Sequence, residues 1–215
     1  MIIEVESHPL LDPLAIRAEL AGPQGEQSPE WLEQLLTPAA GPESVDEQCK
    51  KHIRALLRHG GYRPAGRGKP SSEWLVAAAA RGALASILPL VDVGNAVSRS
   101  AGIPLSVVDL DRLEGPLKIS LGSVGESYIF NRSDQQIDLA GLLCLRDGLG
   151  PCANAVKDSQ RSKTDATTCK VLILIWGTID LPGASRRMGN RLRQLLERLG
   201  AEIEEVGFHR DGSKE

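Results

Sequence analysis

An amphipathic helix joined by a tight turn to an apolar strand is the pattern that most constrains how this 215-residue chain can fold. The stretch LVDVGNAVSRSAGIPLSVVDLD, residues 90–111, predicts an apolar strand end, a helix that ends at Gly102 before Pro104, and a second apolar strand. Its polar residues, in mostly apolar surroundings, include Asp92, Asn95, Ser98, Ser106 and Asp109. Burying unpaired polar groups is costly, so this density predicts either a satisfied hydrogen-bond network or a functional site.

The rest of the chain predicts a mixture of helices and short strands. MIIEVE alternates as a strand, and a further strand is predicted near residues 202–208. Helices are predicted at residues 11–22, 28–38 with Ser28 as N-cap, 46–60, 71–83 and 184–200. From residue 105 the chain is rich in strands separated by regular short turns, and a buried strand follows at 170–177. We therefore predict an α+β fold with an antiparallel, sandwich-like β core and flanking helices.

Length and motif positions suggest one domain with two appendages. We expect residues 1–60 to form an N-terminal helical segment packed on the core and residues 61–178 to form the core itself. Residues 179–215 are expected to form a C-terminal helix and a polar tail.

Charge and cysteine usage narrow the class of protein. The net charge of -3 gives no global field that would attract nucleic acid, so RNA contact needs a local basic patch and DNA binding is not expected. The four cysteines lack the paired spacing of a zinc site, which predicts no metal and a reduced cytoplasmic location. No cofactor is expected. The first residues do not resemble a signal peptide, and no apolar run is long enough to span a membrane.

Two polar segments are candidates for ligand contact. Residues 60–71 form a Gly- and Pro-rich loop with Arg63, Arg67 and Lys69, which suits either a solvated connector or a clamp for a phosphate chain. Residues 148–169 form a second long polar segment that includes Arg161 and Lys163. Long loops inside compact domains are often functional, so both are candidate RNA contacts.

Several motifs together resemble a known family. They are YRPAGRGKPSSEWL (62–75), LVDVGNAV (90–97), PLSVVDLDRLEG (104–115), GE (125–126) and TDATTCKVLILIWG (164–177). This order resembles the B3/B4 editing domain of the phenylalanyl-tRNA synthetase beta subunit and, more closely, its free-standing relatives. The resemblance implies a β-sandwich of unusual topology flanked by helices. It also implies hydrolysis of the ester that joins a wrong amino acid to tRNA.

The same resemblance suggests site residues. Asn95 matches the pocket asparagine of the family, and Ser106 stands where the family has a histidine. The family's substrate-recognising glutamate aligns with Ser159, and Asp158 lies beside it. These matches imply catalytic positions at Asn95 and Ser106, and substrate contacts at Asp158 and Ser159.

Alternative chemistries are weaker. The four histidines lie outside the motifs, which disfavours a Ser–His–Asp triad. Asp92 has a competing role as a helix cap. Cys152 is the only cysteine that is a candidate for reactivity, and we expect it to be a bystander.

The combined prediction is a deacylase that acts in trans on a mischarged tRNA and contacts its acceptor end through Arg63, Arg67, Lys69, Arg161 and Lys163. The alternatives are a non-catalytic module that binds an amino acid or tRNA, and a protein-interaction domain that uses the Arg-rich C-terminal helix.

Overall fold

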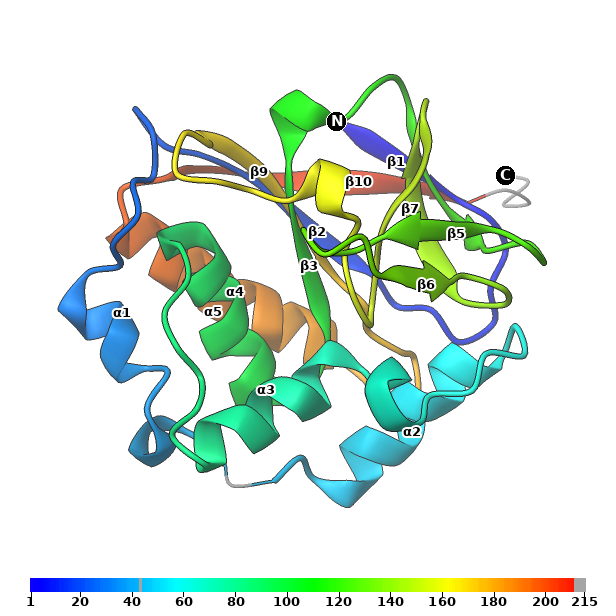
Figure 1. The fold of residues 1–215 in the computed structure, drawn as a ribbon, viewed down its shortest axis with the longest axis horizontal. Helices are drawn as coiled ribbons and strands as arrows, with labels where there is room; N and C mark the ends of the chain where they lie inside the picture. Colours follow the sequence, from blue (N-terminus) through cyan, green and yellow to red (C-terminus); the bar gives the residue numbers. More distant parts are fainter. Residues whose placement is uncertain (43, 211–215) are drawn as a thin grey trace.

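The structure is a computed structural model that describes residues 1–42 and 44–210. One eight-stranded sheet dominates it, in the order β3-β9-β2-β10-β1-β4-β7-β8, and β5 and β6 form a separate hairpin (Figure 1). The strands are β1 (Ile2–Val5), β2 (Leu14–Glu19), β3 (Leu105–Asp109), β4 (Leu117–Leu121), β5 (Ser127–Ile129), β6 (Gln136–Asp138), β7 (Leu143–Asp147), β8 (Gly150–Asn154), β9 (Lys170–Ile175) and β10 (Glu202–Arg210).

The sheet is mixed. Strand β1 pairs in parallel with β10 and with β4, whereas the other pairings in this sheet are antiparallel. The α+β class with flanking helices is thus confirmed, and the two parallel pairings are an addition that the local pattern did not predict. The alternation of apolar and polar residues in β1 predicts that Ile3 and Val5 are buried. It does not predict whether the neighbouring strands run parallel or antiparallel to β1.

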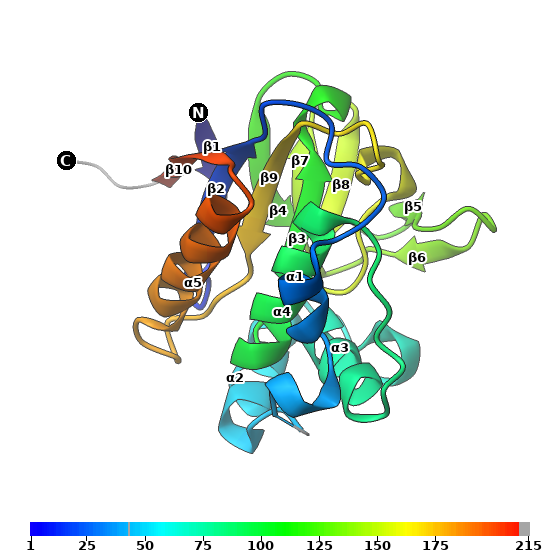
Figure 2. The same cartoon turned by 90° about the vertical axis from the view of Figure 1, so that its left-hand side faces the viewer.

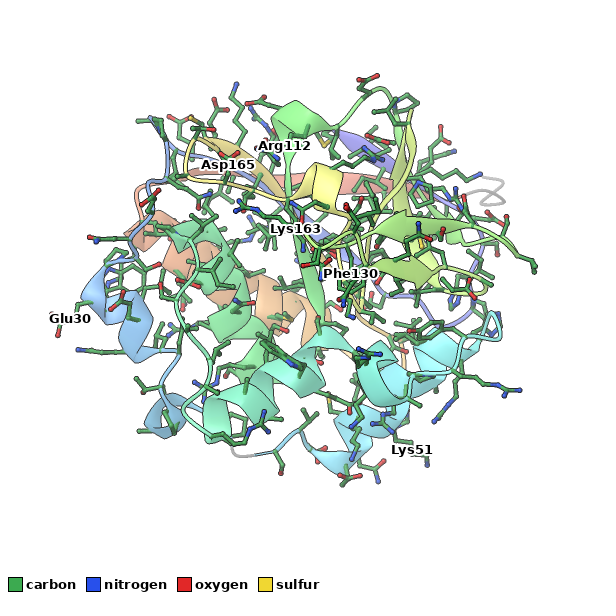
Figure 3. The ribbon with its side chains drawn as sticks, in the orientation of Figure 1. Glu30, Lys51, Arg112, Phe130, Lys163 and Asp165 are labelled. Carbon is green, nitrogen blue, oxygen red and sulfur yellow. The ribbon has the colours of Figure 1, made fainter. Side chains whose placement is uncertain are left out.

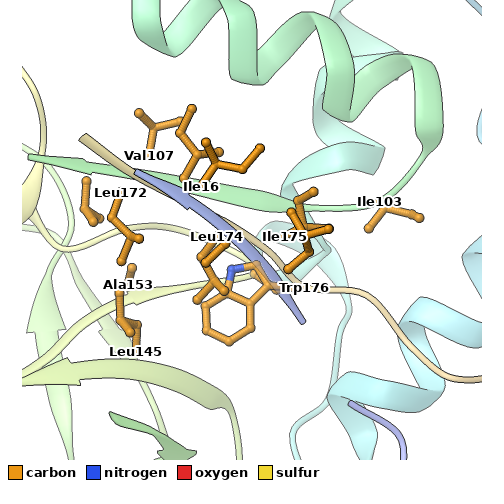
Figure 4. Packing of buried hydrophobic residues seen from close by; sticks show 14 of the residues in the cluster. Ile16, Ile103, Val107, Leu145, Ala153, Leu172, Leu174, Ile175 and Trp176 are labelled. Atoms are coloured by element: carbon orange, nitrogen blue, oxygen red, sulfur yellow. The ribbon is translucent and has the colours of Figure 1, made fainter. Parts of the chain in front are cut away.

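The sheet curls around an apolar core, so that its edge strands β3 and β8 contact each other. Figure 4 shows Leu145 and Ala153 opposite Leu174 and Trp176 inside this curl. The isolated bridge between Val108 and Lys163 lies where the two edges meet. We call this contact region between β3 and β8 the seam.

The helices are α1 (Glu30–Gln34), α2 (Glu47–Arg58), α3 (Ser71–Ala80), α4 (Pro89–Ala101) and α5 (Ala184–Arg198). Helix α5 packs on β2 and β10, and α4 packs on β3 and between α3 and α5 (Figure 2). Gly94 permits the close contact of α4 with β3, because a Cβ atom there would lie 2.9 Å from methyl carbons of Leu105 and Val107. Four short 3-10 helices complete the structure: η1 (Pro38–Ala40), η2 (Gly66–Gly68), η3 (Leu110–Arg112) and η4 (Gln160–Ser162).

Three predicted elements were wrong. The helix predicted at 11–22 is strand β2, whose hydrogen bonds to β9 and β10 outweigh its local helix propensity. The strand end predicted at the start of residues 90–111 belongs to α4, which begins with Pro89 in its first turn and is followed by Gly102 with φ of 72°. The segment 148–169 was expected to be a loop, yet it contains strand β8.

Both ends of the chain contribute to the sheet. Residues 1–60 supply β1 and β2 as well as α1 and α2, and residues 179–210 supply α5 and the predicted strand, β10. Strands β1, β2 and β10 occupy the middle of the sheet between the edges formed by residues 61–178. The domain boundaries at 60 and 178 stay a prediction, and the predicted polar tail at 211–215 lies outside the described residues.

Within the described residues, no helix has the length and apolar character needed to cross a bilayer.

Candidate functional site

A pocket of about 630 Å³ opens between α3, α4, β3 and the segment that follows β8. Its inner wall is apolar and buried, since Val107 and Val156 are only 9% and 5% exposed. Its mouth carries two exposed apolar side chains, Trp74 and Ile87, which are 62% and 56% exposed. A pocket with apolar walls and a few polar groups is typical of a binding site for a small group or the end of a larger ligand.

A single carboxylate, Asp158, joins this pocket to the seam. Its Oδ1 atom accepts hydrogen bonds from the Ser106 hydroxyl at 2.7 Å and from the backbone N–H of Asn154 at 3.3 Å. The backbone N–H of Val107 also donates to this carboxylate. The indole N–H of Trp176 in turn donates to the Ser106 oxygen at 2.9 Å, so the carboxylate is held by groups from both edges of the sheet.

Burial raises the pKa of Asp158 to about 6, because an ionised carboxylate loses hydration there. The hydrogen bonds from Ser106, Asn154 and Val107, together with the charge of Lys163, oppose this effect by stabilising the ionised form. The group therefore changes its charge close to neutral pH, which is unusual for an aspartate and common at functional sites.

Cations outnumber acids around the pocket. Its acids are Asp158 and Glu73, and Glu73 is already paired with Arg54, whose Nε and Nη2 atoms each lie 2.6 Å from a carboxylate oxygen. Its cations are Arg67, Lys69, Arg81, Lys157 and Lys163. In a chain with a net charge of -3, this local excess favours an anionic ligand.

Two of these cations, Lys157 and Lys163, both lie against Phe130. The Nζ atom of Lys157 lies 3.8 Å from the centre of the Phe130 ring, and Lys163 donates to the backbone oxygen of Phe130 (Figure 3). Burial lowers the pKa of Lys157, and the charges of Arg67 and Lys163 lower it further. Burial also lowers the pKa of Lys163. An anion bound between these groups would relieve their mutual repulsion.

The structure brings some of the predicted site residues together. Asn95 and Asp158 both line the pocket. Ser106 is fully buried on the opposite side of β3 from Leu105 and Val107, which face the pocket, and reaches it only through Asp158. Ser159 is buried as well, with its hydroxyl directed to the backbone oxygen of Ile129.

The structure places the predicted RNA contacts in three different surroundings. Arg67, Lys69 and Lys163 line the pocket. Arg63 lines a different hollow, next to Arg58. Arg161 is engaged in the fold, because it donates to both carboxylate oxygens of the buried Asp147, at 2.6 and 2.9 Å.

Trp74, Arg81 and Lys157 are among the pocket residues that were not selected from the sequence. Helix α3 is apolar all round, so its periodicity does not reveal that Trp74 is exposed. Lys157 is adjacent to Asp158, and this proximity in sequence was the available indication.

The other nucleophile and base candidates lie away from the pocket. His8 and His59 pack edge to face, and burial lowers the pKa of His8 to about 4. His52 pairs with Asp180. Cys152, the cysteine considered for reactivity, is buried in β8, and burial raises the pKa of its thiol well above its usual range.

The structure is thus an α+β domain with a curled mixed sheet, covering helices and a cation-lined pocket beside the seam that is large enough for a small ligand. Comparison with known families identifies this arrangement. The model of the B3/4 domain matches residues 64–194, more than half of the chain, and the chain belongs to this family.

Individual relatives agree with the family. The chain is 28% identical over 120 residues to the phenylalanine–tRNA ligase beta subunit of Thiobacillus denitrificans, a match that covers 54% of this chain and 15% of the relative. Its fold is similar to the crystal structure of an N-terminal fragment of the phenylalanyl-tRNA synthetase beta subunit from Pyrococcus horikoshii, with a TM-score of 0.58 and 10% identity. That similarity covers 98% of this chain and 52% of the fragment, so the chain spans only part of each relative.

Proposed function

We propose that this protein hydrolyses, in trans, the ester bond between an amino acid and a mischarged tRNA. The observation that carries the proposal is the pocket in which Asp158 lies below a rim of cations. An aminoacyl ester presents an α-ammonium group to such a carboxylate and a phosphate chain to such a rim. Family membership supports the same substrate, since the relatives named above are subunits of a tRNA ligase.

Each pocket group has a proposed role. Asp158 binds the α-ammonium group of the amino acid, and Asn95 orients the attacking water or the ester carbonyl. Ser106 acts indirectly, because its hydroxyl fixes the position of the Asp158 carboxylate. Arg67, Lys69 and Lys163 bind the acceptor-end phosphates. Ser159 is given no substrate contact, because it is buried and its hydroxyl is directed to the backbone oxygen of Ile129.

The reaction needs no covalent intermediate on the protein. A water oxygen forms a bond to the ester carbonyl carbon and loses a proton, and the resulting tetrahedral species breaks the bond to the ribose oxygen, which takes up a proton. Placing the water and the ester in contact supplies much of the rate enhancement in reactions of this kind. We place this activity in the cytoplasm, where free thiols such as those of the four cysteines persist.

The direct test is incubation of the protein with a panel of aminoacyl-tRNAs that covers matched and mismatched pairs, with release of the amino acid as the readout. We expect faster release from at least one mismatched pair than from its matched counterpart. Absence of release from every pair would contradict the proposal. Salt-sensitive tRNA binding without release would instead favour a non-catalytic tRNA-binding module.

Replacing Asn95 by alanine is expected to reduce kcat by tenfold or more with little change in stability. Asn95 is half-buried, lines the pocket and lies one helical turn from Val91, another pocket residue. Single-turnover release from the active aminoacyl-tRNA measures the effect. His52→Ala is the control, because His52 pairs with Asp180 outside the pocket and its loss should leave kcat unchanged. Unchanged turnover in Asn95→Ala would exclude Asn95 from the reaction.

A further inference from the structure

Trp74 is the exposed member of the three tryptophans in this chain. Trp176 is completely buried in the core, and the half-buried Trp31 is covered by the guanidinium group of Arg198, 4.1 Å from the ring centre. Trp74 instead leaves most of its side chain open to solvent at the mouth of the pocket. Tryptophan is the largest apolar side chain, and such exposure beside a pocket is typical of a contact surface.

The surroundings of Trp74 specify the chemistry of that contact. Ile87 is exposed at the same mouth, and Arg67, Lys69 and Arg81 line the same pocket. An apolar ring with cations beside it matches a nucleotide, which offers a flat π-face and an adjacent phosphate. A purely apolar protein segment would leave these cations without a counter-charge, so the charge pattern favours RNA.

The depth at which residues lie in the pocket indicates how the ligand is oriented in it. Asp158 and Asn95 lie further in than Trp74, because they are less exposed and belong to the same cavity. We propose that the Trp74 indole stacks on the terminal nucleobase of the acceptor strand and so places the ester bond beside Asn95 and Asp158. This inference depends on the proposed function for the identity of the ligand, and it adds the residue that positions the RNA end.

Tryptophan fluorescence can test the contact directly, because stacking quenches an exposed indole and leaves the two covered ones unaffected. The probe is an uncharged RNA oligonucleotide that ends in the CCA sequence of tRNA, so binding is measured without hydrolysis. We expect saturable quenching in the wild-type protein and none in Trp74→Phe. Trp74→Ala should raise Kd about 5- to 100-fold, while Trp74→Phe, which keeps a ring, should show a smaller increase. An unchanged thermal midpoint in both variants shows that the fold is intact.

A second oligonucleotide, which lacks the terminal base, shows whether Trp74 contacts that base. An oligonucleotide without its terminal base should bind the wild-type protein as weakly as the complete oligonucleotide binds Trp74→Ala, and the two losses should not add. Equal affinity of wild type and Trp74→Ala for the complete RNA would overturn the inference. So would self-association that Trp74→Ala abolishes in the absence of quenching, because the indole would then be a protein contact. RNA stacking without ester hydrolysis would refute only the proposed enzymatic function, and hydrolysis without stacking would refute only this inference.

Discussion

Replacing Asp158 by asparagine is expected to lower kcat/KM for ester hydrolysis about 100-fold, because the amide cannot neutralise the α-ammonium group inside the pocket. The side chain keeps its shape, so Ser106 and the Asn154 amide can still donate to its oxygen. Steady-state hydrolysis of the active aminoacyl-tRNA measures the loss. Asp111→Asn, an exposed carboxylate outside the pocket, is the matched control and should be fully active.

The pH dependence follows from the same carboxylate. Its pKa of about 6 means that the binding form is lost as the pH falls through 6, so kcat/KM should fall about tenfold per pH unit below that point. An α-ammonium group loses its charge with an ordinary pKa near 8, so activity should decline again above that pH. The Asp158→Asn variant should not show the fall in kcat/KM at acidic pH. A wild-type profile that stays flat at high pH would contradict ammonium binding and would instead assign Asp158 as a general base.

A substrate variant provides an independent check. Acetylation of the α-amino group removes the charge that Asp158 is proposed to bind, and it should weaken hydrolysis by the wild-type protein about as much as the Asp158→Asn substitution does. The two changes should not add in a double-mutant-style cycle. Full additivity would contradict the contact.

The second large effect is expected for stability. Replacing Asp92 by alanine should lower the free energy of unfolding by about 3–5 kcal/mol and the melting temperature by about 10 °C. Asp92 is fully buried and accepts hydrogen bonds from the hydroxyls of Ser28 and Ser86 at 2.6 and 2.5 Å, and from the backbone N–H of Ile87 at 3.0 Å. Its removal leaves the buried hydroxyl of Ser28 without an acceptor, and it also takes the acceptor from Ser86 and from the N–H of Ile87, which are exposed residues.

Denaturant and thermal unfolding measure this loss, with Asp111→Ala as the exposed control. Asp92 is outside the lining of the pocket, so the fraction of Asp92→Ala that remains folded should hydrolyse substrate at the wild-type rate. Wild-type stability combined with lost activity would contradict the structural role and return Asp92 to the site.

Local patterns predicted the parts of the fold that depend on neighbouring residues. The helix up to Gly102, the turn and strand β3 follow from residues 90–111, and the helix predicted at 46–60 is α2, with Asp46 as its N-cap. Ser28 illustrates the limit, because it was expected to cap α1 but donates instead to Asp92, 64 residues away. Strand β2 was not predicted for the same reason, since its partner strands are remote in sequence.

The candidate site was predicted in part. Asn95 and Asp158 meet in one pocket, although 62 residues separate them, and here the family resemblance supplied what periodicity could not. The two-residue period of β3 could have shown that Ser106 faces away from Leu105 and Val107. Arg161 could not have been excluded from the sequence, because its partner Asp147 approaches only when β7 and β8 pair.

The position of Asp158 at the seam has a consequence for the association of this protein with other chains. Edge strands expose unpaired N–H groups that can recruit another chain, and proteins in general need a device that prevents it. Here the N–H groups of Val107 and Asn154, one from each edge, both point to the Asp158 carboxylate. The residue proposed to select the substrate therefore also occupies two edge N–H groups that could otherwise pair with another chain.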